Sequence, residues 1–212
     1  DRDASLLARA WGEVRHAGWL AGVQFVIEVV PGADDTALAI VAGEAEAVER
    51  VASERFRAAW EHTVPQRAEL VIGAVAGGDA QQTWENFGRA LAASSRVVTE
   101  GGAIALCTEL ATEPGPALQA LVDADDPQQA LRRVRKDRPA DIQPATELAK
   151  ALSMARVYLL SGLDESVVEE LGMAAVGDPA DLARLARRQP RCIVLSDAQY
   201  NIPTAHEDLA VR

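Results

Sequence analysis

The chain has 212 residues, 49% hydrophobic and only 4% aromatic, so its core must be built mainly from Ala, Val, Leu and Ile. This length suffices for one large or two small domains. With 21 basic and 32 acidic residues, the formal net charge of -11 disfavours nucleic acid and anionic membranes as partners. No apolar run reaches the length of a transmembrane helix, and no signal-peptide pattern opens the chain.

The first third of the chain predicts a helix, an antiparallel hairpin and a second helix. Asp3 can cap the first helix. Apolar and polar residues alternate over 22–30, which predicts a half-buried strand. Its apolar face consists of Val23, Phe25, Ile27 and Val29. Turn residues at 31–35 and a second strand at 36–42 complete the hairpin, and helical periodicity follows over 44–62.

The rest of the chain is organised around the next stretch. An unbroken apolar run over 70–76 is typical of a strand buried on both faces. Gly77 and Gly78 end this run, because residues without Cβ permit a tight turn and the close approach of a ligand. Asp79 followed by Gln82 has the spacing of a capping box, so we expect a helix to begin there.

Gln82, Asn86 and Arg89 are spaced i, i+4 and i+7, and are therefore expected to form one polar stripe on that helix. A solvated helix face would explain such a stripe. However, the helix begins at the carboxyl end of a buried strand, where open α/β sheets bind ligands. An amide and a guanidinium suit a carboxylate and a neighbouring hydroxyl. We expect these three residues to bind substrate, with Gly77 and Gly78 beside them.

The remaining sequence alternates strands and helices. Strands are expected at 103–107, 157–160 and 192–195, and helices at 117–123, 127–136, 145–155, 165–171 and 179–188. Parallel strands joined by helices form βαβ units. We therefore predict a single α/β domain over residues 1–212, with three layers and a mixed, mostly parallel sheet flanked by helices. Glu109 follows the strand at 103–107, so it is expected at the ligand-binding edge of the sheet.

The sequence offers no complete catalytic or metal site. Cys107 and Cys192 lie in apolar runs without Cys-x-x-Cys spacing, and are expected to be reduced core residues of a cytoplasmic protein. His16, His62 and His206 are far apart, so no metal site is expected from this chain alone. Neither a Gly-x-Ser-x-Gly elbow nor a phosphate loop is present. We expect no catalytic residue in this chain.

Three features in sequence resemble the C-terminal domain of nickel-pincer-dependent lactate racemases. They are the Gly-Gly turn, the helix with its spaced amide and cation, and the following segment Glu100-Gly101-Gly102-Ala103-Ile104. In that family the helix carries a Tyr-Gln pair and, three residues after the Gln, a Lys. The Gln and the Lys face the substrate. Asn86 and Arg89 occupy these two positions here, and Glu85 departs from the family's tyrosine.

The resemblance runs from the strand near Val23 to the one near Ile193, and it implies an isomerase. Such a racemase or epimerase transfers hydride from a small 2-hydroxy acid to a nickel-pincer nucleotide. The family's N-terminal domain holds this cofactor. Since the chain starts at Asp1 rather than Met, we expect a fragment that lacks that domain and is inactive alone. It would line an interdomain cleft against its own N-terminal domain, with Arg89 pairing the substrate carboxylate and Asn86 a hydroxyl.

Two other functions are left open. Residues 90–106 also resemble the late helix and strand of methyltransferases that use S-adenosylmethionine, although no glycine-rich first loop precedes them. A non-catalytic interaction domain is the third interpretation, and it predicts that Arg89 is packed in a contact rather than open to a cleft.

Overall fold

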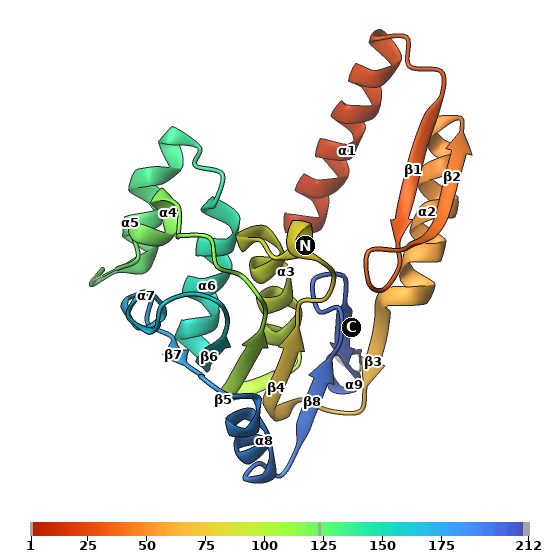
Figure 1. The fold of residues 1–212 in the computed structure, drawn as a ribbon. Helices are drawn as coiled ribbons and strands as arrows, with labels where there is room; N and C mark the ends of the chain where they lie inside the picture. Colours follow the sequence, from red (N-terminus) through yellow and green to blue (C-terminus); the bar gives the residue numbers. More distant parts are fainter. Residues whose placement is uncertain (1, 123, 210–212) are drawn as a thin grey trace. The chain divides into compact units, whose positions relative to one another are not determined.

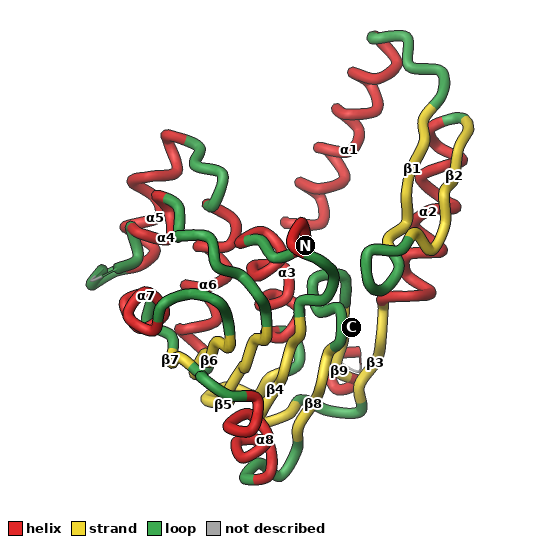
Figure 2. The backbone as a smooth tube through the Cα atoms, in the orientation of Figure 1, coloured by secondary structure: helices red, strands yellow, loops and turns green. Residues whose placement is uncertain are grey.

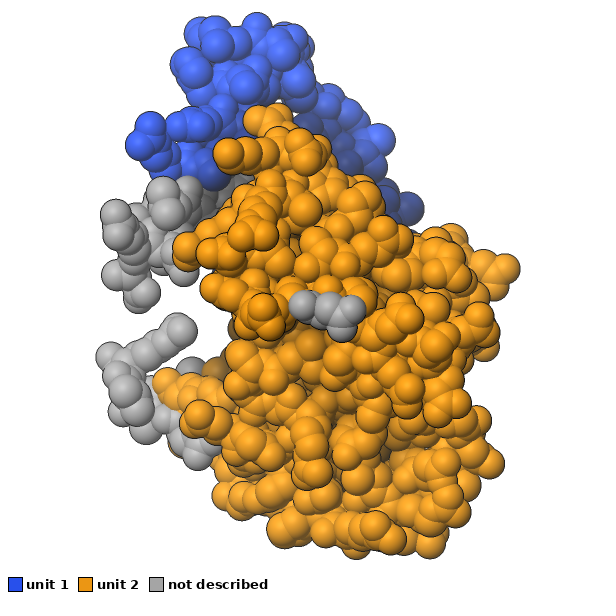
Figure 3. All heavy atoms as spheres, turned by 90° about the vertical axis from the view of Figure 1, so that its left-hand side faces the viewer, with its two compact units in different colours: residues 1–32, 37–59 blue, residues 33–36, 60–212 orange. Residues whose placement is uncertain are grey.

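A computed structural model describes residues 2–122 and 124–209 of the chain. The chain divides into two compact units (Figure 3). The first unit consists of residues 1–32 and 37–59, and the second of residues 33–36 and 60–212. Position 123, the last of the helix expected over 117–123, lies outside the described residues. No helix of the described chain is long and apolar enough to cross a membrane.

The first unit contains the predicted helix, hairpin and second helix. Its elements are α1 (Arg2–Leu20), β1 (Val26–Pro31), β2 (Ala37–Gly43) and α2 (Ala45–Trp60). β1 and β2 pair antiparallel, with Val29 opposite Ile40, which confirms the hairpin. The hairpin forms a separate two-stranded sheet, so it adds no antiparallel strand to the main sheet.

The hairpin buries the face opposite to the one that its sequence predicted. Val30 is 2% exposed and Val48 of α2 is equally buried, whereas Phe25, Ile27 and Val29 are each more than half exposed. Figure 1 shows α2 running behind the hairpin. Within the first unit, only one face of the hairpin is covered, and the strongly apolar face remains open.

The second unit is built on a five-stranded parallel sheet. Its strands are β4 (Ala68–Ala74), β5 (Val98–Cys107), β6 (Arg156–Leu160), β7 (Ala174–Ala175) and β8 (Cys192–Leu195). They lie in the order β7-β6-β5-β4-β8, and every neighbouring pair is parallel (Figure 2). The four expected strands are confirmed, and the short β7 was not predicted. The sheet itself is not mixed.

Helices cover both faces of this sheet, which confirms a three-layer α/β fold. The helices of the unit are α3 (Trp84–Ser95), α4 (Pro116–Gln119), α5 (Pro127–Val134), α6 (Ile142–Met154), α7 (Glu165–Glu170), α8 (Pro179–Arg187) and α9 (His206–Leu209). Phe87 and Leu148, from α3 and α6, join the larger apolar core on one face. Leu182 of α8 lies with Leu70 of β4 in a smaller core on the other face.

The helix α3 packs unusually close to α6. A Cβ atom at Gly88 would lie 2.7 Å from the Cα atom of Pro144, so only glycine fits at this crossing. The aromatic rings of Trp84 and Phe87 meet edge to face at 5.2 Å, and both side chains are buried. Both residues belong to the larger apolar core.

A second small sheet joins the C-terminal segment to the connection before β4. β3 (Glu61–Val64) and β9 (Ile202–Ala205) pair in parallel. The sequence had suggested a helix reaching His62. In fact α2 ends at Trp60, and His62 pairs with Pro203. The pairing joins segments about 140 residues apart, which no local pattern indicates.

Candidate functional site

The most favourable position for a ligand in this fold is the carboxyl end of β4. The chain proceeds from β4 to β5, β6 and β7 in one direction across the sheet, and β8 then lies on the other side of β4. Open α/β sheets bind ligands where the strand order reverses in this way. Gly77 and Gly78 follow β4 at this point.

The Gly77–Gly78 turn already contacts a carboxylate. The backbone N–H of Gly78 donates a hydrogen bond of 2.6 Å to Oδ2 of Asp35. Gly77 has a φ of +96°, and a Cβ atom there would lie 2.7 Å from Oδ1 of Asp35 and 2.6 Å from Cγ of Gln81. Glycine is therefore required at position 77, and the turn has a shape that accepts a carboxylate.

Three aspartates near this turn have left-handed backbones. The φ angles of Asp34, Asp35 and Asp197 are 50°, 60° and 49°. The backbone N–H of Asp34 donates to Oδ1 of Asp197 at 3.4 Å, so the loop at 33–36 and the loop after β8 meet here. Such residues cost about 1–3 kcal/mol each and gather at functional positions. Their convergence supports this edge of the sheet as the candidate ligand-binding site.

The helix α3 begins later than the sequence predicted. Residues 79–81 form a short 3₁₀ turn, and Asp79 makes no capping hydrogen bond there. Thr83 is the N-cap, because its hydroxyl accepts a hydrogen bond of 3.2 Å from the backbone N–H of Asn86. Gln82 therefore precedes the helix, and the expected polar stripe of Gln82, Asn86 and Arg89 does not form.

Gln82 ties the loops after β4 and β5 together. Its side chain is 9% exposed, and its amide nitrogen donates to the carbonyls of Gly77 at 2.9 Å and Val75 at 3.5 Å. Its amide oxygen accepts from the Thr108 hydroxyl at 2.7 Å and from the Glu109 backbone N–H at 2.9 Å. Both polar atoms of Gln82 are thus engaged within the chain.

Asn86 belongs to a second polar cluster, centred on Gln81. Asn86 is buried, and its side-chain nitrogen donates to both the backbone oxygen and Oε1 of Gln81 at 2.9 Å. The Tyr200 hydroxyl reaches the same Oε1 atom at 3.3 Å. The structure therefore places Asn86 next to the Gly77–Gly78 turn, held by the loops after β4 and β8.

Arg89 lies on the exposed side of α3. Its side chain is 49% exposed, and Nη2 donates to Oε1 of Glu85 at 2.5 Å. An exposed pair of this spacing is worth only about 0.3–0.5 kcal/mol, so another carboxylate could readily replace Glu85. Glu109 is also exposed, and its backbone bond to Gln82 holds it at the carboxyl edge of the sheet.

The sequence interpretation missed Gln199 and Tyr200, which close the edge between β4 and β8. The Gln199 side chain donates to the Ala76 carbonyl at 2.9 Å and accepts from its N–H at 3.3 Å. The Tyr200 ring also meets the Trp60 ring at 5.3 Å. Their position in the sequence could have revealed both residues. They follow the last parallel strand after a few residues, and the carboxyl ends of such strands are where ligands bind.

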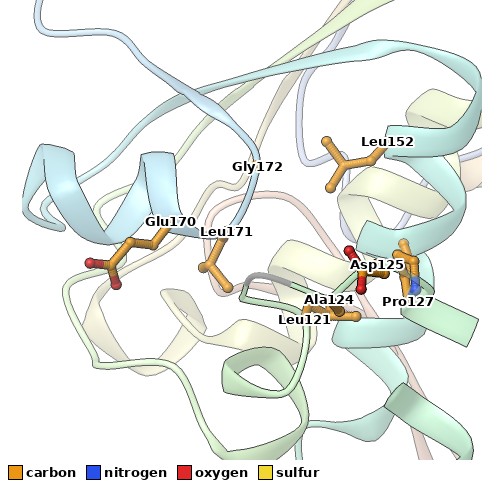
Figure 4. A pocket seen from close by; sticks show the side chains of 9 residues that line it. Leu121, Ala124, Asp125, Pro127, Leu152, Glu170, Leu171 and Gly172 are labelled. Atoms are coloured by element: carbon orange, nitrogen blue, oxygen red, sulfur yellow. The ribbon is translucent and has the colours of Figure 1, made fainter. Parts of the chain in front are cut away.

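A separate hollow of about 410 Å³ lies among the helices of the second unit. Figure 4 shows Leu121, Leu152 and Leu171 at this hollow, with the Glu170 carboxylate directed away. None of the site residues predicted from the sequence lines it. Its lining includes Asp125 and Glu170 and no basic residue, so it does not suit the recognition of a small acid.

The cysteines and acidic residues of the described chain form no metal centre. Among residues 2–122 and 124–209, no group of three or more His, Cys, Asp or Glu could hold a metal ion. Cys107 is partly buried, but Cys192 is exposed, so the expectation of two core cysteines is wrong for Cys192. Desolvation raises the pKa of both thiols, so neither is activated as a thiolate at neutral pH.

The fold and this edge define a parallel α/β protein whose ligand site is expected at the switch point of its sheet. Among solved structures, lactate racemase apoprotein from Thermoanaerobacterium thermosaccharolyticum matches with a TM-score of 0.75 and 18% identity. The match covers 89% of this chain and 48% of that one. A protein from Thermotoga maritima matches with a TM-score of 0.59 and 10% identity, over 85% and 49% of the two chains.

No protein-family model matches this chain, and neither does any curated protein. The chain spans about half the length of the two solved structures. At these identities the likeness establishes the fold, which is that of part of lactate racemase. The resemblance predicted from the sequence is confirmed at this level.

Proposed function

We propose that this chain is the C-terminal cleft-lining domain of a cytoplasmic racemase or epimerase that acts on a small 2-hydroxy acid. The observation that carries the proposal is the likeness of fold to lactate racemase over 89% of the chain. The carboxylate already bound by the Gly77–Gly78 turn supports an acidic substrate. The active enzyme would be the longer protein, and the chain alone would be inactive.

In this proposal the residues of the chain hold and orient the acid. Arg89 exchanges Glu85 for the substrate carboxylate, a charge-assisted contact worth about 1.5–3 kcal/mol. Asn86 and the Gly78 N–H would likewise exchange their present partners, Gln81 and Asp35, for the acid, and Glu109 borders the same edge. Gln82 acts as a positioning residue, because its hydrogen bonds fix both loops.

The described residues do not fit the nickel-pincer cofactor that the resemblance implies. They contain no cluster of metal-binding side chains, so no reaction step is assigned to a nickel ion on this chain. We place that cofactor in an N-terminal domain of the longer protein. This chain would contribute binding and the exclusion of water at the cleft.

The test is racemisation of a panel of 2-hydroxy acids by the complete, cofactor-loaded protein, followed by chiral chromatography. Losing the carboxylate contact in Arg89→Ala should lower kcat/KM by roughly 10- to 150-fold. Arg184→Ala is the matched control, because Arg184 is also an exposed arginine paired with an acid one turn away, on α8. Unchanged turnover in both Arg89→Ala and Asn86→Ala would remove these residues from the mechanism.

A non-catalytic interaction domain is the second candidate, and the contact between Arg89 and Glu85 favours it. This function predicts that no 2-hydroxy acid is turned over by the complete protein. The methyltransferase alternative predicts that the chain binds S-adenosylmethionine, which calorimetry measures directly.

A further inference from the structure

The outer face of the β1–β2 hairpin is an apolar surface without a described partner. It consists of Phe25, Ile27, Val29, Leu38 and Ile40, which are 51–68% exposed. The register places Val29 opposite Ile40 and Ile27 opposite Ala42, so these side chains stand on one face. No charged residue interrupts this face within the two strands.

The size of this outer face is unusual for a surface left in water. Five large side chains, each more than half exposed, present on the order of 500 Å² of apolar area. Patches of that size generally mark interaction sites rather than scattered surface residues. Within the first unit, no element covers this face.

The hairpin also lacks sheet neighbours. Among the described residues, β1 and β2 form a sheet of only two strands. A hairpin needs a third strand or a packed layer to be stable, and α2 supplies a layer on one face only. A partner that covers the outer face would supply this layer, and one that adds a strand would also pair a free edge.

We propose that the outer face of the hairpin is the docking surface for the other half of a longer polypeptide that contains this chain. The proposal rests on the proposed function. The two solved structures with this fold each contain about as much chain again outside the matched part. A covalently linked half is always present at high effective concentration, which allows such a face to persist without aggregation. The occupant is therefore an apolar surface of that half.

Thiol labelling of the complete polypeptide tests this docking. Ile40→Cys places a thiol on the outer face, and Val194→Cys is the matched control, since both positions lie in strands and are 68% exposed. Peptide mass spectrometry separates these sites from the native Cys107 and Cys192. In the 1–212 chain both new thiols should react quickly with a maleimide. In the complete polypeptide the thiol at position 40 should react at least about tenfold more slowly than in the 1–212 chain. The labelling rate of the thiol at position 194 should be unchanged.

Equal labelling of position 40 in the chain and in the complete polypeptide would overturn the proposal. A reading frame containing nothing beyond residues 1–212 would also overturn it. The proposal would also be overturned if the thiol at position 40 of the 1–212 chain became protected as the protein concentration rose and the chain dimerised. The occupant of the outer face would then be a second copy of the chain. Hydrogen exchange of β1 and β2 without any substitution gives an independent readout.

The docking and the proposed function fail separately. A complete polypeptide that protects position 40 but turns over no 2-hydroxy acid would refute the function and leave the docking in place. An active polypeptide whose position 40 stays reactive would refute the docking alone.

Discussion

Replacing Gln82 tests whether this residue positions loops or binds substrate. Its side chain makes three hydrogen bonds of 2.7–2.9 Å and a longer one of 3.5 Å, and it is 9% exposed. Each shorter bond contributes about 1 kcal/mol net, so Gln82→Ala should lower the free energy of unfolding by about 3 kcal/mol. Gln82→Glu keeps the acceptor but sets a buried carboxylate oxygen against the carbonyls of Gly77 and Val75, so it should cost at least as much.

Urea denaturation followed by circular dichroism measures both changes. Gln119→Ala is the control, because Gln119 makes a single exposed hydrogen bond of 2.9 Å, to the Pro114 carbonyl. It should change the free energy of unfolding by about 0.5 kcal/mol or less. If Gln82→Ala leaves stability unchanged but weakens binding of a 2-hydroxy acid, the positioning role is wrong and the sequence interpretation of Gln82 as a ligand is right.

Three further substitutions test the packing and electrostatics of the second unit. Gly88→Ala should cost about 1–3 kcal/mol in urea denaturation, because its Cβ would meet Pro144; a neutral effect would contradict the close crossing. Asp141→Ala should cost about 1–2 kcal/mol, since its carboxylate accepts from the N–H groups of Ala117 and Leu118; an unchanged midpoint would contradict this. The hydrogen bond from Arg191 lowers the pKa of the Glu69 carboxyl group. The unmodified chain should therefore have a higher Tm than the Glu69→Gln variant at neutral pH. This difference should vanish as the pH falls through the lowered pKa. A Tm difference that is the same in acid would refute it.

Much of the fold could be predicted because its signals are local. The apolar run at 70–76 became β4, and Asp178 caps α8 through the Ala180 N–H, as its position before Pro179 indicates. The β3–β9 pair could not be predicted, because its strands are far apart in sequence and β9 contains Pro203, a residue that argues against a strand.

The site was harder to predict because neighbouring signals compete. Asp79 with Gln82 fits a capping box, yet Thr83 is the actual cap, and periodicity alone does not decide between them. This shift of the helix start removed Gln82 from the helix and placed its amide between two loops. Tyr200 joined the site through a contact across 119 residues, which only the fold can create.

The hairpin is the case in which the failed expectation is itself informative. Its alternation correctly identified a strand, but the face meant for burial is open within the first unit. The residues between its strands carry Asp35, whose carboxylate reaches the Gly78 N–H. A partner docked on β1 and β2 would therefore restrain the two strands that lead into this loop. The same docking that covers the apolar face would then also steady the carboxylate at the candidate site, so that the fragment alone should hold Asp35 less firmly than the complete polypeptide.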